Sequence, residues 1–359
     1  MHQSGYIVLE NGRIFKGKYF GATGEVVGEI VFTTGMTGYL ETLTDPSYYG
    51  QIVVQTFPLI GNYGIIPSDF ESSSPKLKAY IVREWCQVPS NFRSEGELDT
   101  FLKTHNIVGV CGIDTRELTK IIREVGVMNA KIATTPDALD KVLAEIKNYR
   151  IIDAVQSVST KEISIAKGVP TGHKVVLWDF GAKENIRREL LKRGCEVITV
   201  PADTTAQEIL DLTPDGVILS NGPGDPADNK EIIVELAKLS QSGVPIFGIC
   251  LGHQLLALAQ GAETVKLKYG HRGANQPVKD LKTGRVYITS QNHGYAVVPD
   301  SLPAHAHLSH LNANDGTCEG IAYQNMPAFS TQFHPEAAAG PLDTGFLFDQ
   351  FIDLVRRVK

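Results

Sequence analysis

A short apolar run meets a helix-forming run at Pro245-Ile-Phe-Gly-Ile-Cys-Leu-Gly-His-Gln-Leu-Leu-Ala257. The residues before Cys250 have the pattern of a buried parallel strand, and those after it are rich in Leu, Ala and Gln, which favour a helix. Gly248 and Gly252 stand two residues before and two residues after Cys250. Because glycine lets the backbone turn sharply without side-chain clashes, this pattern predicts a cysteine raised at a tight strand-to-helix turn.

A thiol at such a turn has a chemical consequence. The positive end of the helix dipole favours the thiolate, which is the nucleophilic form of cysteine. The alternative is a buried structural cysteine, a common fate of a free thiol. The glycines on both sides of Cys250 favour the nucleophile.

The composition indicates a globular protein of two domains, with 359 residues and 42% hydrophobic content. The net charge of -6 and the lack of a long basic run give no sign of a nucleic-acid surface. No apolar run reaches membrane-spanning length and no signal-peptide pattern opens the chain, so we expect no membrane association. Five cysteines without Cys-x-x-Cys spacing fit a reducing cytoplasm better than a disulfide framework or a zinc site. We therefore expect a cytoplasmic protein without a metal.

The first half, residues 1–150, predicts a mixed α/β domain rich in strands, opening with a hairpin that turns at Asn11-Gly12. The segment Gly12–Tyr19 nearly matches a phosphate-binding loop, but Tyr19 stands where Ser or Thr should bind magnesium, so we expect no ATP site here. Residues 34–50 are polar and rich in glycine, which is typical of a loop. We expect strands at 25–33, 51–57, 78–83 and 107–111, and helices at 114–124 and 136–147, each preceded by or opening on a capping residue.

The second half follows a different pattern. Residues 151–172 lose periodicity and predict a linker. Residues 173–359 alternate strands with helices, which predicts a mainly parallel sheet flanked by helices. The strands are expected at 174–180, 196–200, 216–220 and 245–249, and the helices at 183–193, 206–212, 229–240 and 251–260. In such sheets, binding sites lie beyond the carboxyl ends of the strands.

Two more features fall at that edge of the predicted sheet. The loop Ser220-Asn-Gly-Pro-Gly-Asp-Pro226 is either a simple turn or a source of backbone N–H groups, at Gly222 and Gly224, for a developing oxyanion. The stretch Phe329-Ser-Thr-Gln-Phe-His-Pro-Glu336 indicates a strand that ends in His-Pro-Glu. In extended backbone His334 and Glu336 would point the same way, so the carboxylate could orient the imidazole and favour a nearby thiolate.

Other histidines have less specific surroundings. The three at His305, His307 and His310 could hold a metal by spacing, but no carboxylate or cysteine completes the set, so we expect surface residues. His253 is expected to pack behind the cysteine. The segment Asn292-His-Gly-Tyr295 lies between two predicted strands, 286–290 and 296–298, and either presents polar groups to a ligand or is only a turn.

These motifs are similar to known families. The segment Gly248-Ile-Cys-Leu-Gly-His-Gln254, the Gly-Pro-Gly-Asp-Pro loop and the His334-Pro-Glu336 end together resemble the class I (triad) glutamine amidotransferases, whose domain also occurs in GMP, CTP and anthranilate synthases. In the first half, Glu29-Ile-Val-Phe-Thr-Thr-Gly-Met-Thr-Gly-Tyr39, Thr44-Asp-Pro-Ser-Tyr-Tyr49 and Ile60-Gly-Asn-Tyr-Gly64 resemble the small subunit of carbamoyl-phosphate synthetase. Residues 270–278 and 290–297 in the second half also resemble that small subunit. One small departure is Ala339, where the pattern has proline.

The resemblance implies a glutaminase subunit in which Cys250 is the nucleophile, His334 the general base and acid, and Glu336 the orienting carboxylate. The N–H groups of Leu251 and Gly222 would stabilise the oxyanion. It also implies a set of residues that hold glutamine: Ser47, Gly222, Gly224, Leu251, Gln254, Asn292, Gly294 and Tyr295.

The implied partner is a large synthetase subunit that makes carbamoyl phosphate from bicarbonate, ATP and the released ammonia. ATP and magnesium are expected on that subunit and no cofactor is expected in this chain, in a heterodimer or a higher assembly of heterodimers. Whether the product serves pyrimidine or arginine synthesis stays open. Two alternatives remain: a glutaminase that serves another synthetase, and a non-catalytic interaction subunit.

Overall fold

The structure is a computed structural model that describes residues 3–137, 139–168 and 172–358. The chain divides into two compact units after Ile152. The first unit contains the strands β1 (Ser4–Leu9), β2 (Ile14–Gly21), β3 (Val26–Thr33), β4 (Gln51–Gln55), β5 (Leu59–Ile60), β6 (Ala79–Ile81), β7 (Glu84–Trp85), β8 (Val108–Cys111) and β9 (Met128–Ala133). Its helical segments are α1 (Tyr39–Thr44), η1 (Pro46–Tyr48), η2 (Pro67–Asp69), α2 (Leu98–Thr104), α3 (Thr115–Val125) and α4 (Leu139–Asn148).

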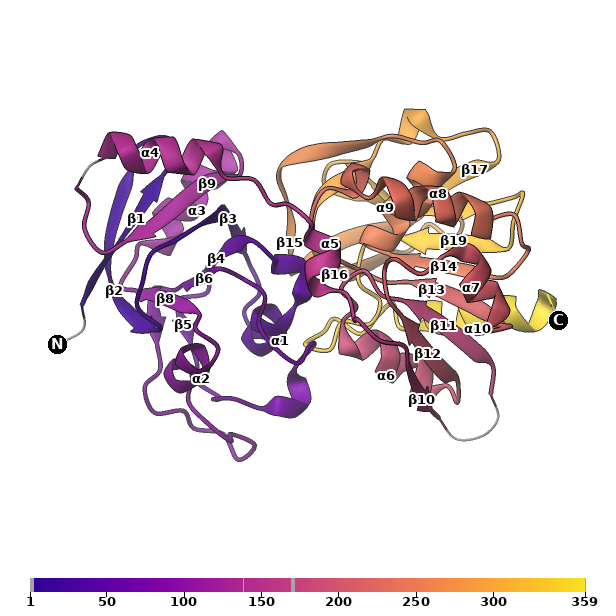
Figure 1. Ribbon diagram of the computed structural model, residues 1–359, viewed down its shortest axis with the longest axis horizontal. Coiled ribbons are helices and arrows are strands. Elements are labelled where there is room, and N and C mark those ends of the chain that lie inside the picture. Colours follow the sequence, from indigo (N-terminus) through magenta and orange to yellow (C-terminus); the bar gives the residue numbers. More distant parts are fainter. Residues whose placement is uncertain (1–2, 138, 169–171, 359) are drawn as a thin grey trace. The chain divides into compact units, whose positions relative to one another are not determined.

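The first unit is built on a sheet that closes on itself, with its strands in the order β1-β2-β8-β6-β4-β3-β9 (Figure 1). Apolar side chains from the inner face of these strands pack against Leu118 and Ile122 of α3. That helix begins where the sequence predicts, because the Asp114 side chain accepts a hydrogen bond from the N–H of Glu117 at 2.9 Å. The outer face is covered in part by α4, whose Val142 and Ile146 pack on Val8.

Two predictions in this unit are wrong. The second helix begins at Leu139 and not at Pro136, since residues 134–137 have no helical hydrogen bonds, and residue 138 lies outside the described residues. The stretch 34–50 is not all loop: it holds α1 and η1, and α1 buries Tyr39, Leu40 and Leu43. A helix of six residues is too short for its apolar spacing to stand out against the surrounding glycines and hydroxyls.

The second unit begins with α5 (Ala154–Val158) and the strand β10 (Ser164–Lys167). It continues with β11 (Lys174–Trp178), α6 (Glu184–Lys192), β12 (Glu196–Val200), α7 (Ala206–Asp211), β13 (Gly216–Leu219), η3 (Pro226–Asp228), α8 (Lys230–Leu239), β14 (Ile246–Ile249) and α9 (Leu251–Ala259). The last part holds β15 (Thr264–Asp280), β16 (Val286–Val297), η4 (Pro299–Ser301), β17 (Ala306–Asn312), β18 (Cys318–Tyr323), β19 (Ala328–Thr331) and α10 (Phe346–Val358).

One mixed sheet organises the second unit, in the order β10-β12-β11-β13-β14-β19-β18-β17-β15-β16. The neighbours from β12 to β19 run parallel, as the alternation of strands and helices predicts. The remaining neighbours are antiparallel. The parallel part is therefore the centre of the sheet, and its carboxyl edge gathers the ends of β11, β13, β14 and β19.

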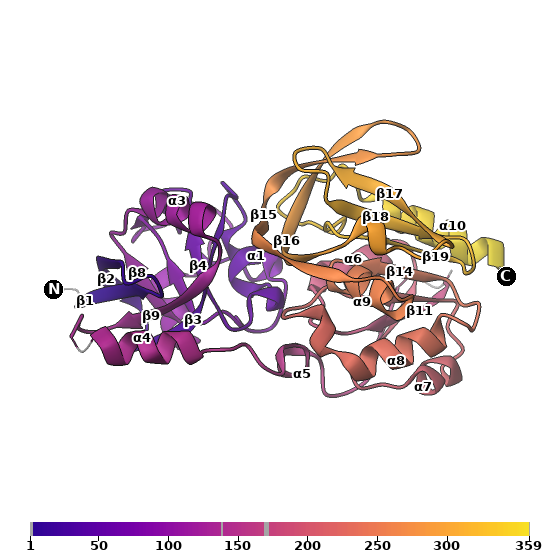
Figure 2. The ribbon, with the colours of Figure 1, turned by 90° about the horizontal axis from the view of Figure 1, so that it is seen from above.

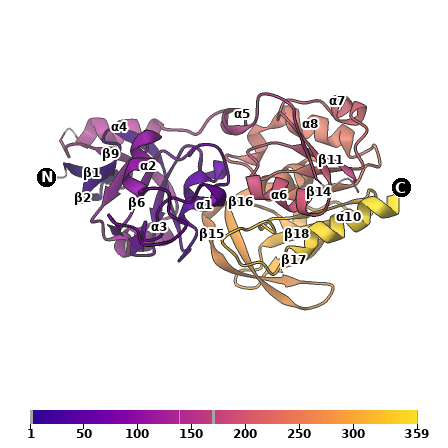
Figure 3. The ribbon, with the colours of Figure 1, turned by 90° about the horizontal axis from the view of Figure 1, so that it is seen from below.

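Helices cover both faces of that sheet. Alternate strand residues such as Trp178 pack with α7, α8 and α9 on one face. Their neighbours, such as Leu177, pack with α6 and α10 on the other. Figures 2 and 3 show the two layers from opposite sides, with α7 and α8 together in one layer. No helix within the described ranges combines the length and apolar character that a membrane span needs.

The predicted linker at 151–172 is shorter than expected. Val155 of α5 is buried in the core of the second unit, and β10 pairs antiparallel with β12. The sequence does not indicate this strand. Because β10 lies at the sheet edge, its side chains are mostly exposed and show no apolar alternation.

The predicted division into two strands, 286–290 and 296–298, with the Asn292–Tyr295 segment between them, is also wrong. Residues 286–297 form one continuous strand, β16, which pairs along most of its length with β15 (Figure 2). Asn292 pairs with Arg272, and His293 pairs with His271. Because β15 is largely polar and was not expected from the sequence, nothing in the pattern indicated a partner for the Asn292–Tyr295 segment.

We expect Phe351→Ala to lower the free energy of unfolding of the second unit by about 3–5 kcal/mol. Phe351 is fully buried on α10, with its ring centroid 6.1 Å from that of Phe247. Denaturant titration followed by Trp178 fluorescence, in a Trp85→Phe background, would isolate this unit. Phe346→Ala on the same helix is the control, because Phe346 is 40% exposed and should cost about 1 kcal/mol or less. Equal losses in both variants would contradict this account of the core.

Candidate active site

Cys250 stands at the junction of β14 and α9, as the sequence predicts. It is the N-cap of α9, with φ 53° and ψ -102°, and its N–H donates to the carbonyl of Thr331 at 2.8 Å. A residue other than glycine at positive φ is strained, by about 1–3 kcal/mol, and such strain persists only where the surroundings impose it. The turn therefore holds the thiol in place at the start of the helix.

The glycines of the turn are required by close packing. A Cβ atom on Gly252 would lie 2.3 Å from the carbonyl oxygen of Leu219 at the end of β13. A Cβ on Gly248 would lie 2.8 Å from the carbonyl oxygen of Gly252. The same holds for the loop after β13, where a Cβ on Gly222 would lie 2.2 Å from the carbonyl oxygen of Phe180 and 2.7 Å from a side-chain atom of Leu251. Gly222 and Leu251 are thus neighbours, as the predicted oxyanion site needs.

His334 and Glu336 form a buried pair beside the thiol. The Nδ1 atom of His334 lies 2.6 Å from Oε1 of Glu336, and both side chains are fully buried. The pair does not sit on a strand, which corrects the predicted geometry: β19 ends at Thr331, and residues 334–337 form a turn in which Ala337 donates to the carbonyl of His334. The turn brings the side chains of His334 and Glu336 together, as an extended strand would also have done.

The charges around His334 favour its protonated form. Burial lowers its pKa and so does the nearby Lys183 ammonium, but the charges of Glu336 and Cys250 more than offset both and raise it to about 10. Burial raises the pKa of Glu336, but His334 and Lys183 outweigh this and lower it. Among the described residues, Nε2 of His334 has no hydrogen-bond partner. The arrangement at neutral pH is therefore an imidazolium that lies between the Glu336 carboxylate and the Cys250 sulfur.

Two residues at this site were missed from the sequence. The Nζ atom of Lys183 lies 3.7 Å from Oε1 of Glu336, and the side-chain amide of Asn185 donates to the backbone carbonyl of Glu336. Lys183 is almost fully buried. Both follow β11 at the carboxyl edge of the parallel sheet, which is the one signal that could have found them.

Most of the residues predicted to hold glutamine lie near Cys250. The thiol donates to the backbone carbonyl of Asn292 at 3.7 Å. Gln254, one helical turn after Cys250, donates from its side-chain amide to the carbonyl of Tyr295 at 2.7 Å and to Oε1 of Gln332 at 2.9 Å. The Gln254 amide therefore ties α9 to β16, the strand that carries Asn292, Gly294 and Tyr295. Gly222 lies against Leu251, the residue after Cys250, whereas a Cβ on Gly224 would lie 2.8 Å from Ala154, so the role of Gly224 toward glutamine stays a prediction.

Ser47 belongs to the first unit, and its role toward glutamine stays a prediction. It lies in η1, where its N–H donates to the Asp45 carboxylate at 2.9 Å. The side chain is largely buried.

The other histidines are placed as follows. His253 is buried behind the thiol, as expected, with Nδ1 2.8 Å from the hydroxyl of Ser330, and burial lowers its pKa to about 3. It is therefore neutral. His307 is exposed, but His310 is buried beside Phe333, so the expectation of a surface residue is wrong there. Alternation along β17 explains the difference, since neighbouring residues face opposite sides.

Comparison with known proteins covers both units. The family model "Glutamine amidotransferase class-I" matches residues 176–354, and the model "Carbamoyl-phosphate synthase small chain, CPSase domain" matches residues 7–132. Curated relatives named carbamoyl phosphate synthase small chain include those of Fusobacterium nucleatum, 55% identical over 96% of each chain, and Clostridium perfringens, 54% identical over 96% of this chain and 98% of that one. The Bacillus cereus protein of that name is 52% identical over 98% of this chain and 96% of its own.

Gly252→Ala should destabilise the protein by about 1–3 kcal/mol or more and slow alkylation of Cys250 by iodoacetamide, because the new methyl group must displace the end of β13. Denaturant unfolding and mass spectrometry of the alkylated peptide would measure the two effects. In the control Gly345→Ala, the nearest atom to the new Cβ lies 3.8 Å away, so both quantities should stay close to wild type. Normal stability and reactivity in Gly252→Ala would refute the packing argument.

Glu336→Gln should lower the pKa of His334 from about 10 by at least about 1, because it removes the negative charge that raises this pKa. The raised pKa stabilises the fold below the ordinary value of 6.5, and this contribution is lost as the pH rises toward 10. The variant should therefore lose less stability than wild type between pH 7 and 10. Titration of ¹⁵N-labelled histidine by NMR would measure the pKa, with Glu208→Gln as an exposed control. An unchanged His334 titration would show that Glu336 does not set its charge.

Proposed function

Because the chain belongs to the family of carbamoyl phosphate synthase small chains, we propose that Cys250, His334 and Glu336 hydrolyse glutamine to glutamate and ammonia for a large synthetase chain. The chain is the glutamine-hydrolysing amidotransferase subunit of that enzyme. The observation that carries the residue assignment is the buried His334–Glu336 pair beside a cysteine held at positive φ.

In the first step, the Cys250 thiolate attacks the side-chain amide carbon of glutamine while His334 holds the proton. The oxyanion that forms would accept hydrogen bonds from the N–H groups of Leu251 and Gly222. The N–H of Leu251 is free for this by the geometry of helices, since the first N–H groups of a helix have no partner within it. His334 then donates its proton to the departing nitrogen, and ammonia leaves a glutamyl thioester on Cys250.

In the second step, His334 acts as a base. It takes a proton from a water molecule, whose oxygen attacks the thioester carbon, and glutamate leaves as the thiolate re-forms. Glu336 orients the ring through Nδ1 in both steps, so that Nε2 is the atom that exchanges protons. Lys183 lies against the same carboxylate and helps to keep it ionised.

Glutamine recognition is proposed to use polar groups around the thiol. Gln254 holds β16 in place through Tyr295, so its contribution includes positioning that strand. Ser47, in the first unit, belongs to this set through the family resemblance. The full proposed set is Ser47, Gly222, Gly224, Leu251, Gln254, Asn292, Gly294 and Tyr295.

The small chain implies a large-chain partner, which would use ammonia, bicarbonate and ATP with magnesium to make carbamoyl phosphate. Ammonia released into water near neutral pH would become ammonium, which is not a nucleophile, so a dry path between the chains makes chemical sense. Pairing into a heterodimer or a larger assembly belongs to the proposal. We also infer a reducing, cytoplasmic setting, since Cys86, Cys111, Cys195, Cys250 and Cys318 are all free thiols.

Cys250→Ser should reduce glutamate release from glutamine, measured with the large chain present, by more than about a thousandfold, because the hydroxyl is a far weaker nucleophile than the thiolate. Synthesis of carbamoyl phosphate from added ammonia should continue, which shows that the large chain is active, and co-elution of the two chains in gel filtration should show that they still assemble. Cys195→Ser is the matched control, since Cys195 is a buried free thiol that precedes β12, whereas Cys250 follows β14 at the opposite end of the parallel strands. Glutamine turnover that survives in Cys250→Ser would favour a non-catalytic interaction subunit. Activity that does not respond to the large chain would favour another synthetase.

A further inference from the structure

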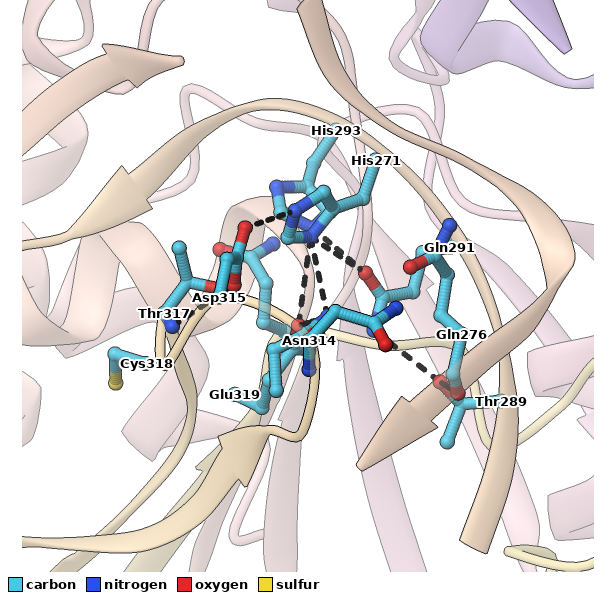
Figure 4. A network of polar contacts seen from close by, with 12 residues as sticks. His271, Gln276, Thr289, Gln291, His293, Asn314, Asp315, Thr317, Cys318 and Glu319 are labelled. Atoms are coloured by element: carbon cyan, nitrogen blue, oxygen red, sulfur yellow. Dashed lines mark hydrogen bonds and ion pairs between the residues drawn. The ribbon is translucent and has the colours of Figure 1, made fainter. Parts of the chain in front are cut away.

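A second polar cluster is buried in the antiparallel part of the sheet, and the proposed reaction does not use it. His271, His293 and Glu319 are all buried, and one potential ligand atom from each lies within 4.8 Å of the others. Figure 4 shows the two imidazole rings side by side, with Gln291 and the Asp315–Glu319 segment on either side of them.

Strand pairing assembles this cluster from distant residues. His271 of β15 lies directly opposite His293 of β16 in the register, so both side chains share one face of the sheet. Gln291, two residues before His293, lies on the same face. Glu319 comes from β18. The spacing of these residues resembles no short ligand motif. There was therefore no sign of this cluster in the sequence, and no metal was expected.

Each potential ligand is held from behind by a second contact. Nε2 of His271 lies 2.9 Å from the Asp315 carboxylate, and Nδ1 of His293 lies 2.8 Å from the backbone carbonyl of Tyr295. The side-chain amide of Asn312 donates to Oε1 of Glu319 at 2.9 Å. In metal sites a ligating histidine almost always gives its other ring nitrogen to a carboxylate or a backbone carbonyl, which fixes the tautomer and turns the free electron pair to the metal.

The potential ligand atoms are electron-pair donors, and the Asn312 amide is the hydrogen-bond donor near them, 3.5 Å from Nδ1 of His271 and 2.9 Å from Oε1 of Glu319. The carbonyl of Tyr295 can only accept, so Nδ1 of His293 carries the hydrogen. Its Nε2 therefore presents an electron pair, 3.1 Å from the acceptor Oε1 of Gln291. Turning the Gln291 amide would relieve that contact, but Oε2 of Glu319 is also buried and has no hydrogen-bond partner among the described residues.

We propose that His271, His293 and Glu319 bind a divalent transition-metal ion of the Zn²⁺ class, with the amide oxygen of Gln291 as the fourth ligand. In a tetrahedral zinc site with bonds of about 2.0–2.1 Å, neighbouring ligand atoms lie about 3.3 Å apart. Nδ1 of His271 lies 3.5 Å from Oε1 of Glu319 and 3.0 Å from Oε1 of Gln291, which already approaches that spacing. Two imidazoles favour zinc over magnesium or calcium, which take oxygen ligands.

The ion would have a structural role. Four protein ligands leave no open position for a substrate, and they come from three strands, so the metal would join β15, β16 and β18. Asn292, whose carbonyl accepts from the Cys250 thiol, is adjacent to His293 on β16. Binding would therefore stiffen the strand that lies against the thiol.

The competitor for the same electron pairs is a proton. Nδ1 of His271 lies 3.5 Å from Oε1 of Glu319 and its Nε2 lies 2.9 Å from the Asp315 carboxylate, so a proton on this ring would be held between two carboxylates. A metal must displace that proton, and metal affinity should fall as the pH falls.

The test uses the untagged full chain in a Cys250→Ser background, because the catalytic thiol and imidazole could themselves bind zinc. Chelator-treated protein is dialysed against Zn²⁺ and its metal content is measured by mass spectrometry. We expect one Zn²⁺ per chain and a rise in Tm of roughly 5–10 °C at a hundredfold excess over Kd. Co²⁺ in place of Zn²⁺ should show the visible absorption of a tetrahedral site.

Three variants locate the site. Glu319→Gln should weaken binding by more than about a hundredfold, and Asp315→Asn by about 10- to 100-fold, since Asp315 acts through His271. His307→Gln, an exposed histidine on β17, should bind like the parent. If Glu319→Gln does not fold, the half-exposed Asp315 still provides the test. A parent chain that binds no metal at 100-fold molar excess of Zn²⁺, or equal binding by the parent and Asp315→Asn or Glu319→Gln, would overturn the proposal and leave a shared proton as the occupant.

Discussion

The contact between Gly252 and the carbonyl oxygen of Leu219 is the constraint on which the second unit depends. Two parallel strands can end side by side with a helix starting directly above one of them only if that helix approaches the neighbouring strand without a side chain. This approach also brings the first residue of α9 next to the loop that follows β13. The position of the thiol and the grouping of the proposed oxyanion donors thus have the same steric origin.

Beside this turn, three buried charged side chains lie in a row, each next to one of opposite sign. Lys183, Glu336 and His334 alternate in sign and are almost or fully excluded from water, where a single unpaired charge would be very unfavourable. Each charge is acceptable because of the next one, so the protonation state of the imidazole belongs to the group and not to the histidine alone. Removing one of these three side chains is expected to change the protonation of the other two before it changes the backbone.

The sequence predicted the parts of this protein that depend on local patterns. The central parallel strands, the elbow at Cys250, the cap at Asp114 and the pairing of His334 with Glu336 all follow from spacing within a few residues. What it missed depends on contacts between distant segments. Lys183 lies 153 residues before Glu336, and β10 has no apolar face because it lies at an edge. The segment at Asn292 looked like a turn because its partner strand is polar.

The pairing of β15 with β16 has a consequence for how these proteins can change in length. The regular pairing of residues 271–273 with 291–293 lies between two irregularities, one on each side. A slip of one residue would turn every side chain in this window to the opposite face, exchanging His293 with its neighbours. The irregularities absorb insertions before they reach the window. The tip of this hairpin, around residues 281–285, is therefore free to vary in length, whereas a single deletion in one of its paired arms, 276–279 or 286–289, would have to be matched by a second one in the other arm.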